Sequence, residues 1–415
     1  MLGFVGLIQF VLVSIILGIR IVPNNKLISV SFFTGYGFVY LVTVIFYVLF
    51  SVEVKKIYFL LLFNFLILLT INRNLYKVKF KYLFSKIIKN KLILFILFPL
   101  LIILFNSKAI GWDVFSHWLP LANALNSSSE FLLRGHATNY PFASSILLVF
   151  SSLYNINIQE NISALFSLLQ LIFVLELILF ALRKQNINQS DLIIKIFLVL
   201  IIFFAPLHMN KFIFTSYVDF DSSVTILFFI FALYFFKLEP QNKETILQLS
   251  LIGCLIVGLK NTGIVLIFFS LLSFILILLF ENFLLTIKKY FIPISILSIM
   301  ILFSWSIWQY LLFTNNMMEK FIVYDYLRSE LIKPFFKSII FQITERKLFY
   351  FFSFFIIILN FFKKKFFIDN NQIIFFISHY TLFFIFWTFF LIITYVFHFN
   401  SDILNNATSF WRYNF

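Results

Sequence analysis

Long apolar stretches separated by short polar segments run through the chain, and this alternation restricts the fold more than any other feature. A helix that crosses a bilayer needs about 20 mostly apolar residues, and fewer where its ends are satisfied inside the protein. The sequence therefore predicts an all-α, polytopic transmembrane helical bundle of about twelve spanning helices. The stretches are Leu2 to Ile21, Leu27 to Phe50, Ile57 to Ile71, Leu92 to Phe105, Ile162 to Leu182, Leu192 to Leu207, Asp221 to Phe236, Ile246 to Gly258, Gly263 to Phe280, Phe291 to Phe313, Phe349 to Phe362 and Gln372 to Phe397.

The composition excludes a soluble fold and several kinds of partner. Hydrophobic residues make up 62% of the chain and charged residues 12%, about half the share expected of a soluble domain. The net charge of +15 comes from Lys and Arg beside apolar stretches, so we expect membrane lipids and not nucleic acid as partners. Cys254 is the single cysteine and the five His residues form no HExxH pair, so no disulfide, metal or cofactor is expected. Met1 to Ile21 lacks a basic start and a cleavage site, which favours a spanning helix over a signal peptide.

The basic residues also predict the orientation of the helices, because cytoplasmic loops hold the excess of Lys and Arg. All four clusters share one side if both termini lie on the opposite, extracytoplasmic side. Two longer polar stretches, Asn106 to Phe142 and Thr314 to Lys347, are then extracytoplasmic loops. Ala143 to Tyr154 is too short to span, so we expect an interfacial helix that lies in or dips into the outer leaflet. The four clusters are Arg73 to Lys91, Arg183-Lys184, Lys288-Lys289 and Lys363 to Lys365.

A first polar motif, Gly111 to Pro120, follows the fourth apolar stretch and places Asp113 at the membrane boundary. Trp112, His117 and Trp118 surround this carboxylate in the sequence. One interpretation is an aromatic belt with a helix cap, since Trp prefers this depth and Asp favours helix starts. The other is a general base that takes a proton from an acceptor hydroxyl.

Two further motifs precede apolar helices. Tyr140-Pro141 stands before the expected interfacial helix, where Pro suits a first turn. Tyr217, Asp219 and Asp221 stand at the outer start of the seventh apolar stretch. Carboxylates are costly when they face lipid, so the pair points either into a wet cavity or into solvent as a helix cap.

Gly258 to Gly263 interrupts an apolar run and contains Lys260 and Asn261. A turn between two short helices accounts for the glycines but not for the lysine. Ionisable residues within a membrane are candidates for function, so we expect Lys260 to neutralise an anion or to pair with one of the two carboxylates of the seventh stretch.

Two other charged residues have structural and functional interpretations. Glu176 stands two turns from Arg183 on the same helix, which favours a pair near the cytoplasmic end. Arg412, in Trp411-Arg412-Tyr413, follows the last helix. Its planar guanidinium suits a phosphate, and an anchor in the headgroup layer is an equal alternative.

In this order the motifs resemble those of the GT-C superfamily of membrane glycosyltransferases, and especially bacterial relatives of protein O-mannosyltransferases and lipid A aminoarabinose transferases. The similarity covers residues 92–415, which implies a GT-C-like catalytic core that is shortened at its C-terminus. Residues 1–91 form a three-helix membrane extension ahead of it. The chain departs from the family at Phe142, where a second Pro usually stands.

The resemblance implies a bacterial inner-membrane enzyme with an extracytoplasmic active site. Asp113 corresponds to the family's catalytic Asp, and the donor is a sugar on a polyprenyl phosphate. Lys260 and Arg412 are cations available for its phosphate, and the acceptor is a glycan, a lipid or a protein. A transporter or flippase of lipid-linked saccharide is the main alternative, since broken helices and midplane charges occur there too. A surface-polysaccharide polymerase or ligase and a structural membrane scaffold are further alternatives.

Overall fold

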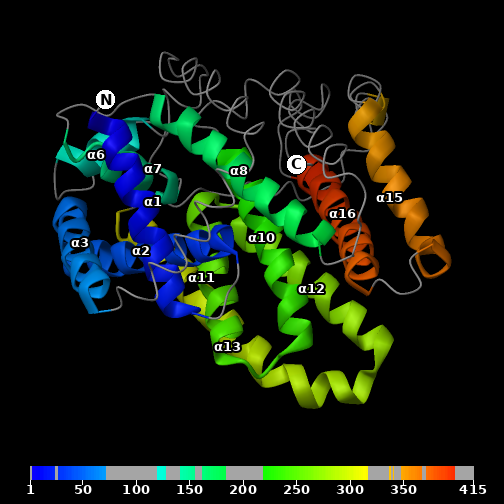
Figure 1. The fold of residues 1–415 in the computed structure, drawn as a ribbon. Coiled ribbons are helices and arrows are strands. Elements are labelled where there is room, and N and C mark those ends of the chain that lie inside the picture. The colour runs from blue at the N-terminus through cyan, green and yellow to red at the C-terminus, as the bar shows by residue number, and fades with distance from the viewer. Residues whose placement is uncertain are drawn as a thin grey trace, which may run out of the picture.

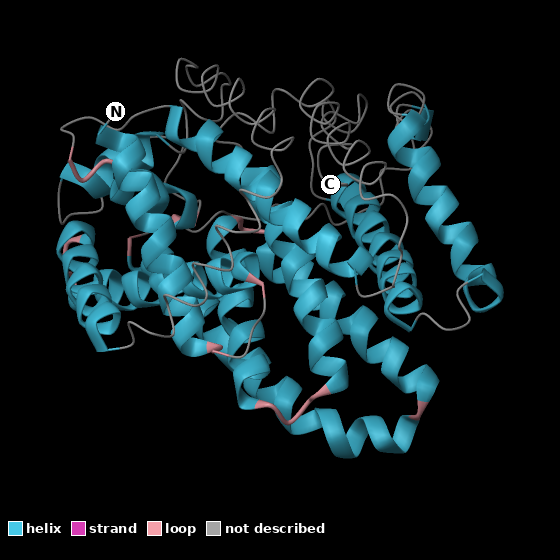
Figure 2. Cartoon of the chain, in the orientation of Figure 1, coloured by secondary structure: helices cyan, strands magenta, loops and turns pink. Residues whose placement is uncertain are grey.

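The fold is a bundle of helices, as the apolar stretches predict. The computed structural model describes residues 2–23, 27–71, 119–127, 141–154, 161–183, 218–315, 336–337, 340, 347–366 and 371–397. Within these ranges it contains twelve α-helices and no strand (Figures 1 and 2). They are α1 (Leu2–Ile21), α2 (Ile28–Phe50), α3 (Val54–Ile71), α6 (Leu119–Ser127), α7 (Ala143–Ser151), α8 (Asn161–Arg183), α10 (Val218–Leu238), α11 (Lys243–Leu259), α12 (Gly263–Glu281), α13 (Phe283–Thr314), α15 (Lys347–Phe366) and α16 (Asn371–Phe397).

Seven of the described helices are long and apolar enough to cross a membrane, namely those containing Gly3–Ile21, Ile28–Phe50, Val54–Ile71, Phe220–Leu238, Gly263–Glu281, Lys288–Thr314 and Asn371–Thr394. The described part of the chain is therefore all-helical, and its apolar helices are those of a multi-pass membrane protein. The predicted number of twelve spans stays a prediction, since the stretches Leu92 to Phe105 and Leu192 to Leu207 lie outside the described residues.

Small residues bring α1 and α2 into close backbone contact. A Cβ atom on Gly18 would stand 1.7 Å from the carbonyl oxygen of Ser31, and one on Gly35 would stand 1.8 Å from that of Ser14. Ser14 and Gly18 lie four positions apart on α1, and Ser31 and Gly35 lie four positions apart on α2. The two pairs face each other, with Gly18 against Ser31 and Gly35 against Ser14, so the helices are antiparallel. Such pairs let helices approach in lipid, where packing rather than water drives association.

The helix at the centre of the bundle is α2, which contacts α1, α3, α8, α10, α11 and α13. It runs in the same direction as α11, because Gly37 meets Leu251 and Gly258 meets Tyr40. The first two helices therefore share one hydrophobic core with the later ones. The predicted division into residues 1–91 and 92–415 stays a prediction.

A carboxylate from α8 accepts hydrogen bonds from the first backbone N–H groups of α2. Leu27, the residue before α2, has no side chain able to cap a helix. The Glu176 carboxylate instead accepts hydrogen bonds from the N–H groups of Ile28, at 3.3 Å, and Ser29, at 2.8 Å. A negative charge is favoured at this position because the first N–H groups of a helix lack partners and carry partial positive charge. The predicted pair with Arg183 stays a prediction, since that side chain is not described.

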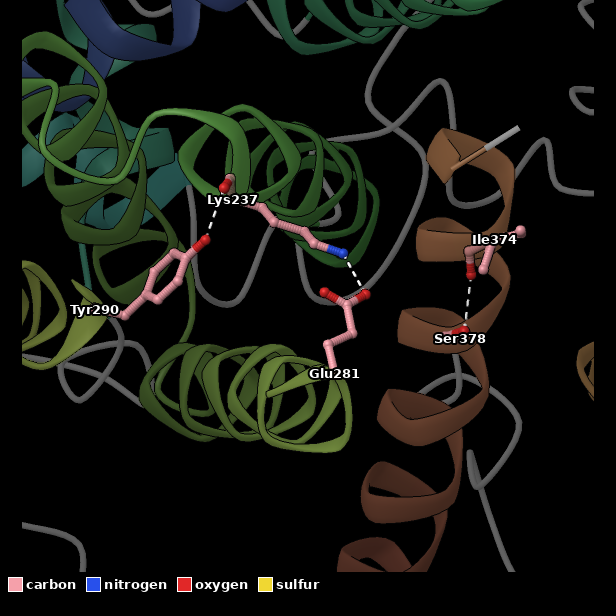
Figure 3. Close-up of polar contacts among 5 residues, drawn as sticks. All are labelled: Lys237, Glu281, Tyr290, Ile374 and Ser378. Atoms are coloured by element: carbon pink, nitrogen blue, oxygen red, sulfur yellow. Dashed lines mark hydrogen bonds and ion pairs between the residues drawn. The ribbon is translucent and has the colours of Figure 1, made fainter. Parts of the chain in front are cut away.

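One end of the bundle is fastened by polar contacts between α10, α12 and α13 (Figure 3). Lys237, in the last turn of α10, forms an ion pair with Glu281 at the end of α12. The Tyr290 hydroxyl of α13 donates a 2.7 Å hydrogen bond to the carbonyl oxygen of Lys237. A third contact in the same view lies within α16, where the Ser378 hydroxyl donates a hydrogen bond to the carbonyl oxygen of Ile374. We call this side of the bundle the Lys237 end.

The start of α1 and the end of α16 lie on the opposite side, at the top of Figure 1. The predicted placement of both chain termini on the extracytoplasmic side stays a prediction, since the terminal residues lie outside the described ranges. We call the side that carries the start of α10, the end of α11 and the start of α12 the Lys260 end.

The surroundings of α7 differ from those expected of a helix lying on the outer leaflet. All nine residues of α7 are buried, and the helix contacts α1, α3, α6, α8 and α11. A helix on a membrane surface exposes one face to water and one to lipid. The first of the two predicted placements, a helix lying flat on the outer leaflet, does not fit this burial, and the second, a helix that dips into the leaflet, stays a prediction.

Candidate functional site

The candidate site begins at the break between α11 and α12, as Gly258 to Gly263 predicts. Lys260, the residue after α11, has an extended backbone conformation, with φ of −147° and ψ of 143°. The Gly263 N–H then donates a 2.8 Å bond to the carbonyl oxygen of Lys260. A Cβ atom on Gly263 would stand 2.3 Å from the carbonyl oxygen of Ile256, so the tight turn between α11 and α12 requires glycine at this position. The predicted turn is confirmed.

The break lies below the surface that the neighbouring helix reaches. The 17 residues of α11 span about 25 Å at 1.5 Å per residue, which is less than the roughly 30 Å of a hydrocarbon core. The 21 residues of α10 span about 31 Å. Irregular backbone at membrane depth is tolerated only where protein encloses it or where it lines a wet cavity.

Asp221 stands at the same level as Lys260. The helices α10 and α11 form an antiparallel hairpin, and each residue lies 17 positions from the turn, Asp221 before Leu238 and Lys260 after Lys243. Asp221 is 7% exposed. It lies inside the first turns of α10 together with Asp219, of which only the backbone is described. The interpretation of Asp221 as a solvated cap is therefore wrong, and its carboxylate belongs to the interior of the Lys260 end.

Two tyrosines of α2 lie beside these groups. The Tyr36 hydroxyl donates a 2.7 Å hydrogen bond to the carbonyl oxygen of Ala143, at the start of α7. Asp221 and Tyr40 interact electrostatically with Tyr36. Sequence reasoning missed both tyrosines because they stand inside an apolar stretch. The available signal is their spacing of four residues, which puts two hydroxyl groups on one face of an otherwise apolar helix.

A layer of buried polar groups connects Tyr40 to the helix break. A Cβ atom on Gly258 would stand 2.1 Å from the Tyr40 ring, so the ring lies directly on the end of α11. Among the described residues, the Asn261 side-chain oxygen and the Thr262 hydroxyl are buried without a hydrogen-bond partner, and the buried hydroxyl groups of Tyr40 and Ser304 interact with each other. A buried polar group left unpaired costs about 1–3 kcal/mol. Two such groups at the helix break, next to the buried hydroxyl groups of Tyr40 and Ser304, make this layer suited to a polar guest, either water or ligand.

Aromatic rings close the layer on the side of α7. Phe142, the residue before α7, lies 6.1 Å from Tyr40, 5.8 Å from Tyr47 and 5.3 Å from Trp308 between ring centroids. The residue that follows the predicted Tyr140-Pro141 motif therefore places a buried ring in this site. The helix itself begins at Ala143, two residues after Pro141.

The chain was also compared with known proteins. No family model, curated protein or solved structure matches it.

Part of the predicted site lies at one end of the bundle. Asp221, Lys260 and Asn261 are at the Lys260 end, with the backbone of Asp219 beside them. No group of three or more His, Cys, Asp or Glu side chains suited to a metal occurs in the ranges described. Seven predicted site residues lie outside the described residues, and their placement stays a prediction: Trp112, Asp113, His117, Trp118, Tyr140, Tyr217 and Arg412.

Proposed function

We propose that the chain is an integral membrane glycosyltransferase that moves a sugar from a polyprenyl-phosphate donor to an extracytoplasmic acceptor. The observation that carries the proposal is that Asp221 and Lys260 lie at the same level of the hairpin of α10 and α11, at a helix break inside an apolar bundle, beside the unpaired side chains of Asn261 and Thr262. A lipid-borne phosphosugar needs a cation for its phosphate and hydrogen-bonding groups for its hydroxyls. The order of the motifs, which resembles that of the GT-C superfamily, gives further support.

The proposed reaction is a displacement at the anomeric carbon of the sugar. Asp113 accepts the proton of the acceptor hydroxyl, and the hydroxyl oxygen forms a bond to the anomeric carbon. The bond from that carbon to the phosphate oxygen breaks, and the polyprenyl phosphate leaves with the electron pair. Lys260 stabilises the negative charge that builds on the departing phosphate. Binding donor and acceptor in one place supplies the orientation.

Transfer from radiolabelled polyprenyl-phosphate hexoses and pentoses, measured with purified full-length protein, tests this reaction. We expect D113N to abolish transfer while the protein still inserts in the membrane and keeps its melting temperature. Full transfer by D113N would exclude Asp113 as the base.

Binding of polyprenyl monophosphate tests the role of Lys260 separately. A hydrogen bond to a charged group contributes about 1.5–3 kcal/mol, so K260Q should weaken binding by roughly 10- to 100-fold. The matched control is K243Q, at the exposed opposite end of the same helix, which should bind as the unchanged protein does. Equal affinity for K260Q and K243Q would contradict the proposal.

The second candidate function is a transporter or flippase of lipid-linked saccharide. The broken pair α11 and α12 favours it, because transporters bind substrates at interrupted helices. A transferase releases a glycosylated acceptor, whereas a flippase moves an intact fluorescent lipid between the leaflets of a vesicle. The two assays on one preparation separate the alternatives.

A further inference from the structure

The helix α13 is longer than a membrane crossing requires. Its 32 residues span about 48 Å, against about 30 Å for a hydrocarbon core. Pro293 lies inside the helix, and the 22 residues from Pro293 to Thr314 alone span about 33 Å. The turns before Pro293 are therefore not needed to cross. In Figure 1 the first part of α13 runs along the lower edge of the molecule, at the Lys237 end.

These first turns present an exposed face with a regular spacing. Phe283, Leu284, Lys288, Phe291 and Ile292 are all exposed, and Leu284, Lys288 and Ile292 follow one another at intervals of four. Residues four apart lie on the same side of a helix. The exposed face is thus apolar, with a lysine at its centre. We call the segment 280–293 the elbow; it begins with Phe280, which is 84% exposed.

The opposite side of the elbow is fixed to the bundle through Tyr290. This side chain is buried, and its ring lies 5.8 Å from that of Phe236 and 6.1 Å from that of Phe274. Its hydroxyl bonds to the carbonyl oxygen of Lys237. The contacts of Tyr290 therefore fix the orientation of the elbow, so that its exposed face points away from the bundle.

The charges of the elbow favour an anionic partner. Its acidic residue, Glu281, forms an ion pair with Lys237 of α10. Lys288 is exposed, and the Lys289 ammonium lies 5.8 Å from the centre of the Tyr290 ring. Two adjacent lysines beside exposed aromatic and aliphatic side chains match a lipid surface, since long basic side chains place their charge in the headgroup layer while their stems lie along apolar surface.

We propose that the elbow lies in the headgroup layer at the Lys237 end and binds anionic phospholipid. Phe283, Leu284, Phe291 and Ile292 contact the acyl chains, and Lys288 and Lys289 contact the phosphates. A soluble anion would leave the apolar face uncovered, so the partner is the lipid. The proposal does not depend on sugar transfer at the other end of the bundle.

Native mass spectrometry of the full chain, titrated with phosphatidylglycerol or phosphatidylcholine of identical acyl chains, tests it. A basic residue near an anionic surface contributes on the order of a fivefold change in affinity. K288Q/K289Q should therefore weaken phosphatidylglycerol binding by roughly 25-fold and leave phosphatidylcholine binding unchanged. The single variants K288Q and K289Q should each lose about fivefold, and K288R/K289R should keep the preference.

The matched control is K55Q/K56Q, which changes two adjacent lysines in the first turn of α3 and should keep the preference for phosphatidylglycerol. An unchanged preference in K288Q/K289Q would overturn the proposal. So would an equal loss of both lipids in a variant that keeps its melting temperature, because the effect would then not depend on lipid charge.

Discussion

Replacing Glu176 should destabilise the bundle more than replacing any exposed carboxylate. In E176A the N–H groups of Ile28 and Ser29 lose the carboxylate that accepts from them at 3.3 and 2.8 Å. A hydrogen bond to a charged acceptor contributes about 1.5–3 kcal/mol, and the longer of the two contributes less. Leu27 offers no replacement cap. We therefore expect a loss of about 2–3 kcal/mol in the free energy of unfolding.

Two further variants separate the charge from the hydrogen bonds. E176Q keeps a side-chain oxygen as acceptor and loses the favourable charge at the helix start, so we expect a loss of about 1 kcal/mol. R183Q tests the pair that the sequence favours. If Glu176 acts on α2 alone, R183Q should change stability by less than about 0.5 kcal/mol.

The assay is reversible unfolding of the purified chain in mixed micelles with increasing denaturing detergent, followed by tryptophan fluorescence. The control is E53A, which removes the exposed carboxylate paired with Lys56 and should cost less than about 1 kcal/mol. The reasoning fails if E176A and E53A unfold at the same detergent fraction. It also fails if R183Q is as damaging as E176A, because the ion pair would then be the main contribution.

Three other variants test the packing in the same assay. G35A places a Cβ atom 1.8 Å from the backbone of Ser14 and should cost at least about 1–3 kcal/mol, whereas at Gly253 the obstacle is the flexible end of the Ile301 side chain and G253A should cost less. Y40F removes a buried hydroxyl that interacts with the Ser304 hydroxyl of α13 and should cost about 1 kcal/mol; no loss would mean that this contact does not stabilise the packing of α2 on α13. H379L removes the 3.2 Å contact between the His379 ring and the Ser270 hydroxyl and should cost about 1 kcal/mol; no loss would mean that this contact does not hold α12 and α16 together.

Much of the helical framework could be predicted from the sequence. The bounds of α1 are those of the apolar stretch, and α2, α12 and α16 differ from theirs by one residue at an end. These helices are apolar from end to end and are flanked by polar residues. The start of α13 was predicted eight residues late, at Phe291 instead of Phe283, because Lys288 and Lys289 interrupt the apolar pattern but not the helix.

Contacts between distant segments could not be predicted in this way. Glu176 and Ser29 are 147 residues apart, and no periodicity in either segment indicates that they meet. The short helix α6 was missed because its residues read as part of a polar loop. The burial of α7 depends on five neighbouring helices, whereas the pattern of one segment shows only that it is apolar.

The candidate site was predicted in part. Lys260 and Asn261 stood out because glycines and a charge interrupt an apolar run, and the turn is confirmed. Tyr40 and Ser304 did not, since a single hydroxyl in an apolar helix is common and becomes significant only when several such groups are buried together.

The central claim is that Asp113 meets Asp221 and Lys260 at one end of the bundle, and cysteine crosslinking tests it most directly. In a C254S background with a short bis-maleimide, D113C/K260C should crosslink within the chain, and D113C/K243C, whose second site lies at the far end of α11, should not. Crosslinking of D113C/K243C, or none in D113C/K260C with both thiols reactive, would contradict the account.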